Sequence, residues 1–587
     1  MPPQEAPDIS ELSIARFHTA LREGTTTCEA VVDRYLTRIA QYDSTLKTLI
    51  RVNENAKSEA ATKDKETRQY QETNQRFPAG RLHGVPLIVK DNFSTRDLPT
   101  SAGVRALQTL QTYDDSKAVA LLRDSGAIIL AKANLHELAL QGTTTSSLGG
   151  QTLNPYDLGR TPGGSSGGTG AALAADLGLV GCGTDTVNSL RSPASACAVV
   201  GFRPARGSVS GRGVVPVSET QDAAGPMARS VADVRILYEV MAGRDNPQTM
   251  PLRIREAKAR QEHPWRVGVV EAYFELESSS GSSDDNPDLV TESTTVQSTI
   301  RTALAAVQER GDITLIPIDT ASHGDWSVAT LLVNADTQSF EFQECLDSFL
   351  QSAQISTMPH CSLASIAASG EYEPRAVTDA FTAPLDDPGT FCLSSAAYKD
   401  RLANIASLKE SVSRCFEEYG LDALVYPHQR HLVVPTGTMA QPGRNGALAA
   451  LTGRPAICIP AGFSPATSTA PRGVPIGLEL MGRDVVDDEL LGLAEHFERI
   501  LQARRAPDLS GVDKKPNIEA KCRWLYIGLM SMCEQPKIFR KCKPKYSARK
   551  MKKAEQRINI SIRGVHTPRH TMYPLQDKTN AFYSHGN

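Results

Sequence analysis

The chain contains the stretch Thr161-Pro162-Gly163-Gly164-Ser165-Ser166-Gly167-Gly168, and a second serine segment follows it as Gly183-Thr184-Asp185-Thr186-Val187-Asn188-Ser189-Leu190-Arg191-Ser192-Pro193. Upstream, Lys90 ends the apolar run that begins at Gly84. A lysine that apolar neighbours desolvate can be neutral enough to accept a proton from a serine hydroxyl. The loop around Ser189 can direct successive backbone N–H groups at a developing oxyanion. Two serines and a lysine of this kind predict a hydrolase of amides or esters.

Short apolar runs alternate with helical stretches from Gly84 onward. The apolar runs span residues 85–89, 127–131, 177–182 and 456–460, and the helical stretches include residues 116–123, 170–175 and 488–504. Continuous apolar runs of this length are typical of strands that are buried on both faces. The alternation therefore predicts an α/β fold with helices layered on a buried sheet.

The first 75 residues show a helical pattern of their own. Thr26 and Glu29 have the spacing of a capping box, and one helical face then carries Val31, Val32, Tyr35, Leu36 and Ile39. An amphipathic helix must bury its apolar face. We therefore expect residues 1–75 to pack on a catalytic domain that spans residues 76–513.

These motifs resemble those of the amidase signature family, and the likeness covers residues 8 to 505. It continues through Leu82-His83-Gly84-Val85-Pro86, Ala131-Lys132-Ala133-Asn134-Leu135-His136-Glu137, Asn154-Pro155-Tyr156-Asp157, Gln221-Asp222-Ala223-Ala224-Gly225-Pro226-Met227-Ala228-Arg229 and Gly473-Val474-Pro475-Ile476-Gly477-Leu478-Glu479-Leu480-Met481-Gly482-Arg483. The resemblance places the family's base on Lys90, its cis serine on Ser165 and its nucleophile on Ser189. The two serines are 24 positions apart, as in the family. The resemblance also implies a mixed central β-sheet covered by helices on both faces.

The turn before the nucleophile departs from the family pattern. Val187 and Asn188 stand where the family usually has two glycines, within the turn Thr186, Val187, Asn188 and Ser189 whose backbone N–H groups the resemblance makes the oxyanion hole. A β-branched residue at a position that needs a positive φ would be strained. We expect the oxyanion hole to persist with less room for the acyl group, and a degenerate, inactive site is the alternative. Asp185 and Arg191 are predicted to form an ion pair that braces this loop.

The resemblance implies an amidase that converts a carboxylic amide to a carboxylate and ammonia or an amine through an acyl-enzyme. It implies no metal and no organic cofactor, and its expected partner is a small-molecule amide. The alternative within the family is the amidase subunit of a glutamine-dependent tRNA amidotransferase, which releases ammonia for a partner subunit. Residues 322–401 match the family least, in a region that helps to line the family's substrate entrance. The substrate stays open.

Three rival interpretations come from other motifs. Gly164-Ser165-Ser166-Gly167-Gly168 fits the G-x-S-x-G elbow of α/β-hydrolases with Ser166 as nucleophile, but the polar loop at residues 154–162 stands where that motif needs a strand. His428 and His431 form an HxxH pair, which has no companion Cys or carboxylate cluster and is interpreted as loop histidines rather than metal ligands. The third rival is a binding protein that uses the amidase core only as a scaffold and engages nucleic acid with its basic C-terminal tail.

Composition separates the end of the chain from the rest. The formal net charge of the 587 residues is −3, whereas residues 514–587 hold 17 Lys and Arg against 4 Asp and Glu. We interpret residues 514–587 as a basic, poorly ordered tail and expect no nucleic-acid partner. The alternative is a basic appendage for nucleic acid or another anionic surface, which would use clusters such as Arg549-Lys550-Met551-Lys552-Lys553. No secretory signal or membrane span is visible, and the 11 cysteines lack CxxC spacing. These features predict a cytoplasmic protein without a membrane partner, and a homo-oligomer is left open.

Overall fold

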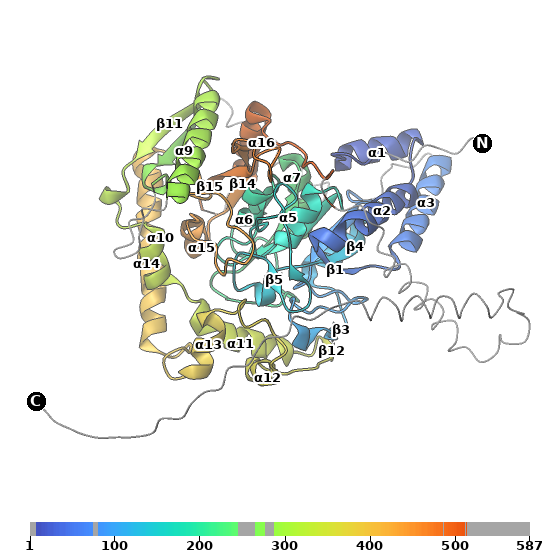
Figure 1. Ribbon diagram of the computed structural model, residues 1–587, viewed down its shortest axis with the longest axis horizontal. Helices are drawn as coiled ribbons and strands as arrows, with labels where there is room; N and C mark the ends of the chain where they lie inside the picture. Colours follow the sequence, from blue (N-terminus) through green and yellow to red (C-terminus); the bar gives the residue numbers. More distant parts are fainter. Residues whose placement is uncertain are drawn as a thin grey trace, which may run out of the picture. The chain divides into compact units, whose positions relative to one another are not determined.

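An 11-stranded mixed sheet lies at the centre of the fold (Figure 1). The computed structural model describes residues 8–73, 80–244, 264–275, 287–484, 487–510 and 512. In spatial order the strands are β1 (Leu49–Val52), β4 (Ile128–Ala133), β2 (Pro86–Lys90), β7 (Val180–Asp185), β9 (Ala223–Ala228), β8 (Val200–Arg203), β14 (Ala456–Phe463), β15 (Pro475–Gly482), β13 (Ala423–Pro427), β10 (Trp265–Val270) and β11 (Ile313–Ile318).

The pairing of the strands makes the sheet mixed. Strands β4, β2 and β7 run parallel at one end, and β13, β10 and β11 run parallel at the other. The strands between them pair antiparallel, as β1 does with β4 at its edge. The four apolar runs predicted from the sequence correspond to β4, β2, β7 and β14, so the predicted buried sheet is confirmed. Two short two-stranded sheets lie outside it, β3 (Gln111–Thr112) with β12 (Ile355–Thr357) and β5 (Thr145–Ser146) with β6 (Gly150–Gln151).

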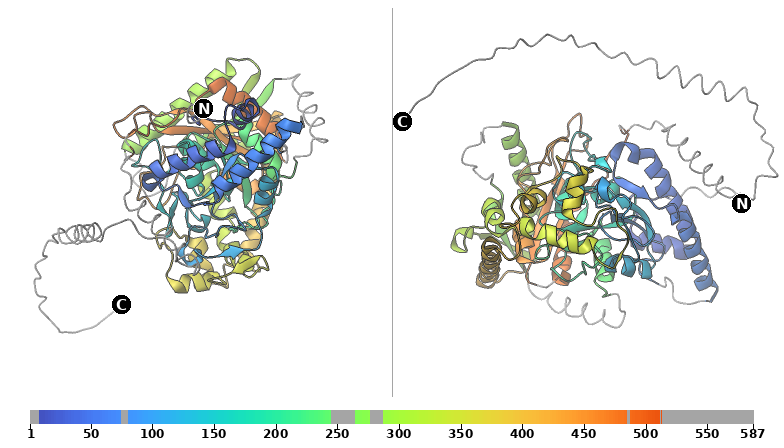
Figure 2. Two further views of the ribbon diagram at one scale, coloured as in Figure 1. Left: turned by 90° about the vertical axis from the view of Figure 1, so that its right-hand side faces the viewer. Right: turned by 90° about the horizontal axis from the view of Figure 1, so that it is seen from below.

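Helices cover both faces of the sheet, as the family resemblance implied (Figures 1 and 2). They are α1 (Ile14–Glu23), α2 (Cys28–Leu46), α3 (Ala56–Thr73), α4 (Lys117–Asp124), α5 (Gly167–Ala174), α6 (Arg191–Ala196), α7 (Val231–Met241), α9 (Pro287–Gln308), α10 (Val328–Ala335), α11 (Gln338–Leu350), α12 (Leu363–Ser369), α13 (Asp379–Asp386), α14 (Ala396–Tyr419), α15 (Ala447–Thr452) and α16 (Asp487–Leu501). None of the helices in the described ranges is long and apolar enough to cross a membrane.

Helix α2 buries the apolar face predicted for it, which includes Val31, Val32 and Tyr35. The predicted capping box is wrong by one residue. Thr27 is the N-cap, and its hydroxyl accepts from the Ala30 N–H at 3.0 Å. The N–H groups of Cys28 and Glu29 donate instead to the Asp64 carboxylate of α3. A carboxylate from a neighbouring helix thus satisfies donors that a local capping box would have served.

Helices α11, α12 and α13 belong to the middle region, residues 322–401, and pack on the segment that follows β4. Their apolar side chains, including Phe342 and Leu346 of α11, form a separate core cluster with residues such as Leu135 and Leu138 that follow β4. The segment after β4 leads toward the loop that carries Ser165, because the Ser165 carbonyl accepts from the His136 N–H at 3.0 Å. The middle region is therefore packed against the surroundings of the candidate site.

The proposed domain limits are only partly within the described chain. The boundary expected at residue 75 lies in residues 74–79, and the basic tail at 514–587 also lies outside the described residues. The last described residue, Val512, is buried in the main core cluster.

Candidate active site

Lys90 is the last residue of β2, and its side chain is completely buried. Its Nζ donates to the Ser165 hydroxyl at 2.8 Å and to the Thr184 hydroxyl at 2.8 Å. Burial lowers the pKa of Lys90 to about 7, against the opposing attraction of the Asp185 carboxylate. A lysine with this pKa is substantially neutral near pH 7 and can act as a base.

Ser165 lies in the loop that leads into α5, and it is completely buried. The Gly164–Ser165 peptide bond is cis, as the family resemblance implied. A Cβ at residue 164 would lie 2.7 Å from the Thr144 hydroxyl and 2.9 Å from the Gly142 carbonyl carbon, so this approach needs glycine. The loop holds the Ser165 hydroxyl at the lysine that was predicted to be its partner.

Ser189 lies in the turn between β7 and α6 and is 8% exposed. Its carbonyl accepts from the Ser166 N–H at 3.1 Å, which ties the turn to the Ser165 loop. Within the described ranges the Ser189 hydroxyl makes no hydrogen bond, so the Lys90–Ser165 contact is formed and a Ser165–Ser189 contact is not. Catalytic hydrogen bonds often tighten only when substrate binds.

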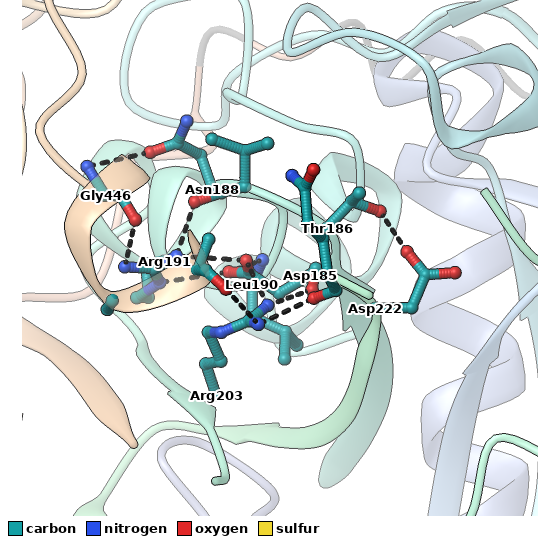
Figure 3. Close-up of polar contacts among 12 residues, drawn as sticks. Asp185, Thr186, Asn188, Leu190, Arg191, Arg203, Asp222 and Gly446 are labelled. Atoms are coloured by element: carbon teal, nitrogen blue, oxygen red, sulfur yellow. Dashed lines mark hydrogen bonds and ion pairs between the residues drawn. The ribbon is translucent and has the colours of Figure 1, made fainter. Parts of the chain in front are cut away.

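Buried charges brace the turn that carries Ser189 (Figure 3). The Arg191 guanidinium donates to both Asp185 oxygens at 3.0 Å, which confirms the predicted ion pair. Arg203 also pairs with Asp185 at 3.1 Å, and Arg191 extends to Glu479 of β15. Burial alone would raise the pKa of Asp185, but the two guanidinium groups hold that pKa well below its ordinary value.

The backbone of this turn is open to a ligand. The N–H groups of Thr186, Val187, Asn188 and Ser189 donate to no acceptor in the part of the chain that the structure describes. The strain that a positive φ would have caused at Val187 does not arise, because neither Val187 nor Asn188 has a positive φ. The Thr186 hydroxyl donates to Asp222 at 2.6 Å, and the Asn188 side chain accepts from the Gly446 N–H at 3.1 Å (Figure 3). Side-chain contacts thus hold the turn and leave its donors free.

A cavity of about 450 Å³ opens at Ser189. Its lining includes the turn at residues 186–189 and residues of α10, α11 and α13, among them Leu332, Phe340 and Ala380. Part of the region at residues 322–401 thus lines this cavity, and its role at a substrate entrance stays a prediction. Val187 contributes its side chain to the cavity wall, where a glycine would leave more room.

The surroundings of Ser166 and of the HxxH pair bear on the two rival assignments, a Ser166 nucleophile and a metal site. Ser166 is buried, does not line the cavity at Ser189, and donates its hydroxyl to the Thr184 carbonyl at 3.2 Å. His428 contacts Glu479 at 2.6 Å, whereas His431 contacts the Leu432 carbonyl at 2.9 Å. The two histidines therefore have different hydrogen-bond partners and share none. In the described residues no group of three or more His, Cys, Asp or Glu side chains is arranged to hold a metal ion.

Sequence reasoning missed several residues of the site. Thr184 shares Lys90 with Ser165, and Arg203 and Glu479 complete the charge network. Thr184 and Glu479 stand inside motifs quoted for the family, which was an available signal. Arg444, which also lines the cavity, lies outside every quoted motif, so no sequence signal indicated its position.

Comparisons with known proteins agree with this geometry. The family model described as Amidase matches residues 30–491. The A subunit of the glutamyl-tRNA(Gln) amidotransferase of Deinococcus deserti is 31% identical over 514 residues, which cover 83% of this chain and 96% of that protein. The corresponding protein of Thermus thermophilus is 31% identical over 489 residues, covering 80% and 93%. The crystal structure of a peptide amidase from Stenotrophomonas maltophilia superposes with a TM-score of 0.70 at 29% identity, covering 85% of this chain and 99% of that one.

The fold and these matches define an enzyme that hydrolyses carbon–nitrogen bonds other than peptide bonds. Within that class, the chain belongs to the amidase family.

Proposed function

We propose that this amidase uses Lys90 as base, Ser165 as proton relay and Ser189 as nucleophile. The observation that carries the proposal is the completely buried Lys90, whose amine lies 2.8 Å from the Ser165 hydroxyl beside a cavity that Ser189 lines. A neutral amine in that position can accept a proton, and a serine hydroxyl can pass one on.

The acylation step follows from these positions. Neutral Lys90 takes the proton of Ser165 while Ser165 takes the proton of Ser189. The Ser189 oxygen bonds to the amide carbon, and the carbonyl electron pair moves to the oxygen, where the N–H groups of residues 186–189 stabilise the negative charge. The relayed proton passes to the leaving nitrogen as the C–N bond breaks, which leaves an ester on Ser189.

Water completes the reaction by the reverse relay. Water gives one proton to Ser165, which passes its own proton to Lys90, while the water oxygen attacks the ester carbon. The relayed proton returns to the Ser189 oxygen as the ester C–O bond breaks, and the acid that leaves loses its remaining proton to solvent to become a carboxylate. The overall products are a carboxylate and ammonia or an amine, and no step needs a metal or an organic cofactor. Because the described cysteines are free thiols, we place the reaction in the cytoplasm.

The second candidate is the amidase subunit of a glutamine-dependent tRNA amidotransferase, and the names of the curated relatives at 31% identity favour it. We favour a stand-alone amidase for two reasons. Val187 and Asn188 line the cavity beside Ser189 where the family usually has two glycines, and residues from 322–401, the stretch that resembles the family pattern least, line the same cavity. Glutamine hydrolysis that needs added partner subunits, with no turnover of other amides, would support the second candidate.

The test is turnover of a simple aryl amide by the purified full chain. We expect Ser189→Ala and Lys90→Ala each to lower kcat/KM by about a thousandfold or more, and the double variant to be no worse, because residues of one relay are not additive. Ser166→Ala is the matched control and should be much milder. Full activity of Ser189→Ala or Lys90→Ala would refute the triad.

A further inference from the structure

Arg444 is a half-buried arginine of the candidate site that forms no ion pair within the described residues. It lines the cavity at Ser189, and in the described chain its guanidinium makes no ion pair and no hydrogen bond. Arg401, the other arginine of the cavity, instead donates to the Leu332 and Val333 carbonyls and lies over the Phe340 ring. Arg444 is therefore the cavity's arginine with unused donors.

The position of Arg444 is tied to both candidate serines. Two residues along the chain, the Gly446 N–H donates to the Asn188 side chain at 3.1 Å, and the Gly446 carbonyl accepts from Arg191 at 3.1 Å. A Cβ at Gly142 would lie 2.1 Å from the Arg444 Nη1, and Gly142 in turn lies against Gly164, beside Ser165. The guanidinium thus lies close to the reacting centre.

The acidic side chains of the cavity do not neutralise this charge. Both Asp336 oxygens accept from the Gln338 amide at 3.0 Å, and Asp379 is exposed at the start of α13. The Asp185 carboxylate attracts Arg444 from nearby, but it already pairs with Arg191 and Arg203. Burial lowers the pKa of Arg444 to about 10 against that attraction, so the group is still charged at neutral pH. A partly desolvated guanidinium without a counter-ion is costly, and an anionic ligand would remove that cost.

We propose that Arg444 binds a carboxylate of the substrate, so that this amidase prefers amides that carry a carboxylate near the scissile bond. The inference rests on the proposed function, because it names the substrate class of the same site. The cavity lining also includes the apolar side chains of Val187, Leu332, Phe340 and Phe391, which suit an apolar portion of the same molecule. The planar guanidinium can donate two parallel hydrogen bonds to a carboxylate.

The experiment compares matched amide substrates that differ only in a carboxylate or a neutral carboxamide, placed on the acyl part in one pair and on the amine part in another. The full chain should show a kcat/KM at least about tenfold higher for the carboxylate member of one pair, as expected for charge-assisted hydrogen bonds. Arg444→Met should bring that ratio to about one.

Two further variants separate charge from folding. Gly142→Ala keeps the arginine but displaces its guanidinium, so it should also reduce the ratio. Arg375→Met removes an exposed arginine that pairs with Glu373 and lies outside this cavity, and it should keep the ratio. A ratio that persists in both Arg444→Met and Gly142→Ala overturns the inference.

Binding to the Ser189→Ala variant distinguishes the failure of this inference from that of the proposed function. Calorimetry should show tighter binding of the carboxylate member, with the difference lost in Ser189→Ala combined with Arg444→Met. Selective binding without hydrolysis by the unmodified chain would sustain the inference and refute the proposed function. Hydrolysis and binding that are both indifferent to the carboxylate would refute the inference alone.

Discussion

Lys90 shows how burial and hydrogen bonding set the chemistry of a single side chain. An exposed lysine is protonated at neutral pH, whereas burial lowers the pKa of Lys90 to about 7. The sequence indicated this because Lys90 ends an apolar run. It did not indicate the Thr184 hydroxyl that shares the Lys90 amine, since that contact joins residues 94 positions apart.

The pKa of Lys90 predicts the pH dependence of turnover. Protonated Lys90 cannot accept a proton, so log kcat/KM for a neutral amide should rise by about one per pH unit below pH 7 and level off above it. A pH profile from 5 to 9 in buffers of constant ionic strength measures this. A flat profile, or a rise that continues beyond pH 9, would contradict the assignment of Lys90 as base.

At the scale of elements, the turn between β7 and α6 depends on partners from distant strands. Asp185 and Arg191 are six residues apart, and their ion pair was predictable from local sequence. Arg191 also reaches Glu479 of β15, 288 positions away, and Arg203 comes from β8. Such partners depend on the order of strands in the sheet, which local periodicity does not specify.

The charge network at this turn makes a prediction about stability. Arg191→Met leaves Asp185 and Glu479 buried with fewer partners and should lower the free energy of unfolding by about 3–5 kcal/mol. Chemical denaturation monitored by fluorescence measures the change. Arg375→Met, which breaks an exposed ion pair, is the control and should have no measurable effect. Equal stability of the two variants would show that the network does not hold the turn.

On the scale of the whole molecule, the sequence predicted the fold class, but it did not predict the order of the strands or the placement of the middle region. Apolar runs identified β4, β2, β7 and β14, because strands buried on both faces leave a continuous signal. The strand order and the placement of the middle region over the site arise from packing between distant segments. The family resemblance supplied the sheet type, which periodicity could not.

The domain limits make a prediction for a shortened chain. The Arg504 side chain pairs with Glu11 at 2.7 Å, and Val512 is buried in the main core cluster. A protein that ends at residue 513 keeps these contacts and should match the full chain in amidase turnover and thermal midpoint. A shortened protein that is insoluble, or folded and inactive, would show that the boundary is misplaced.

The most direct test of the account is the site of covalent labelling by a fluorophosphonate probe, identified by mass spectrometry of the digested protein. The probe reacts with an activated serine, so it should modify Ser189 in the full chain and leave the Lys90→Ala variant largely unlabelled. Modification of Ser166, or labelling of Ser189 that does not depend on Lys90, would contradict the proposed triad.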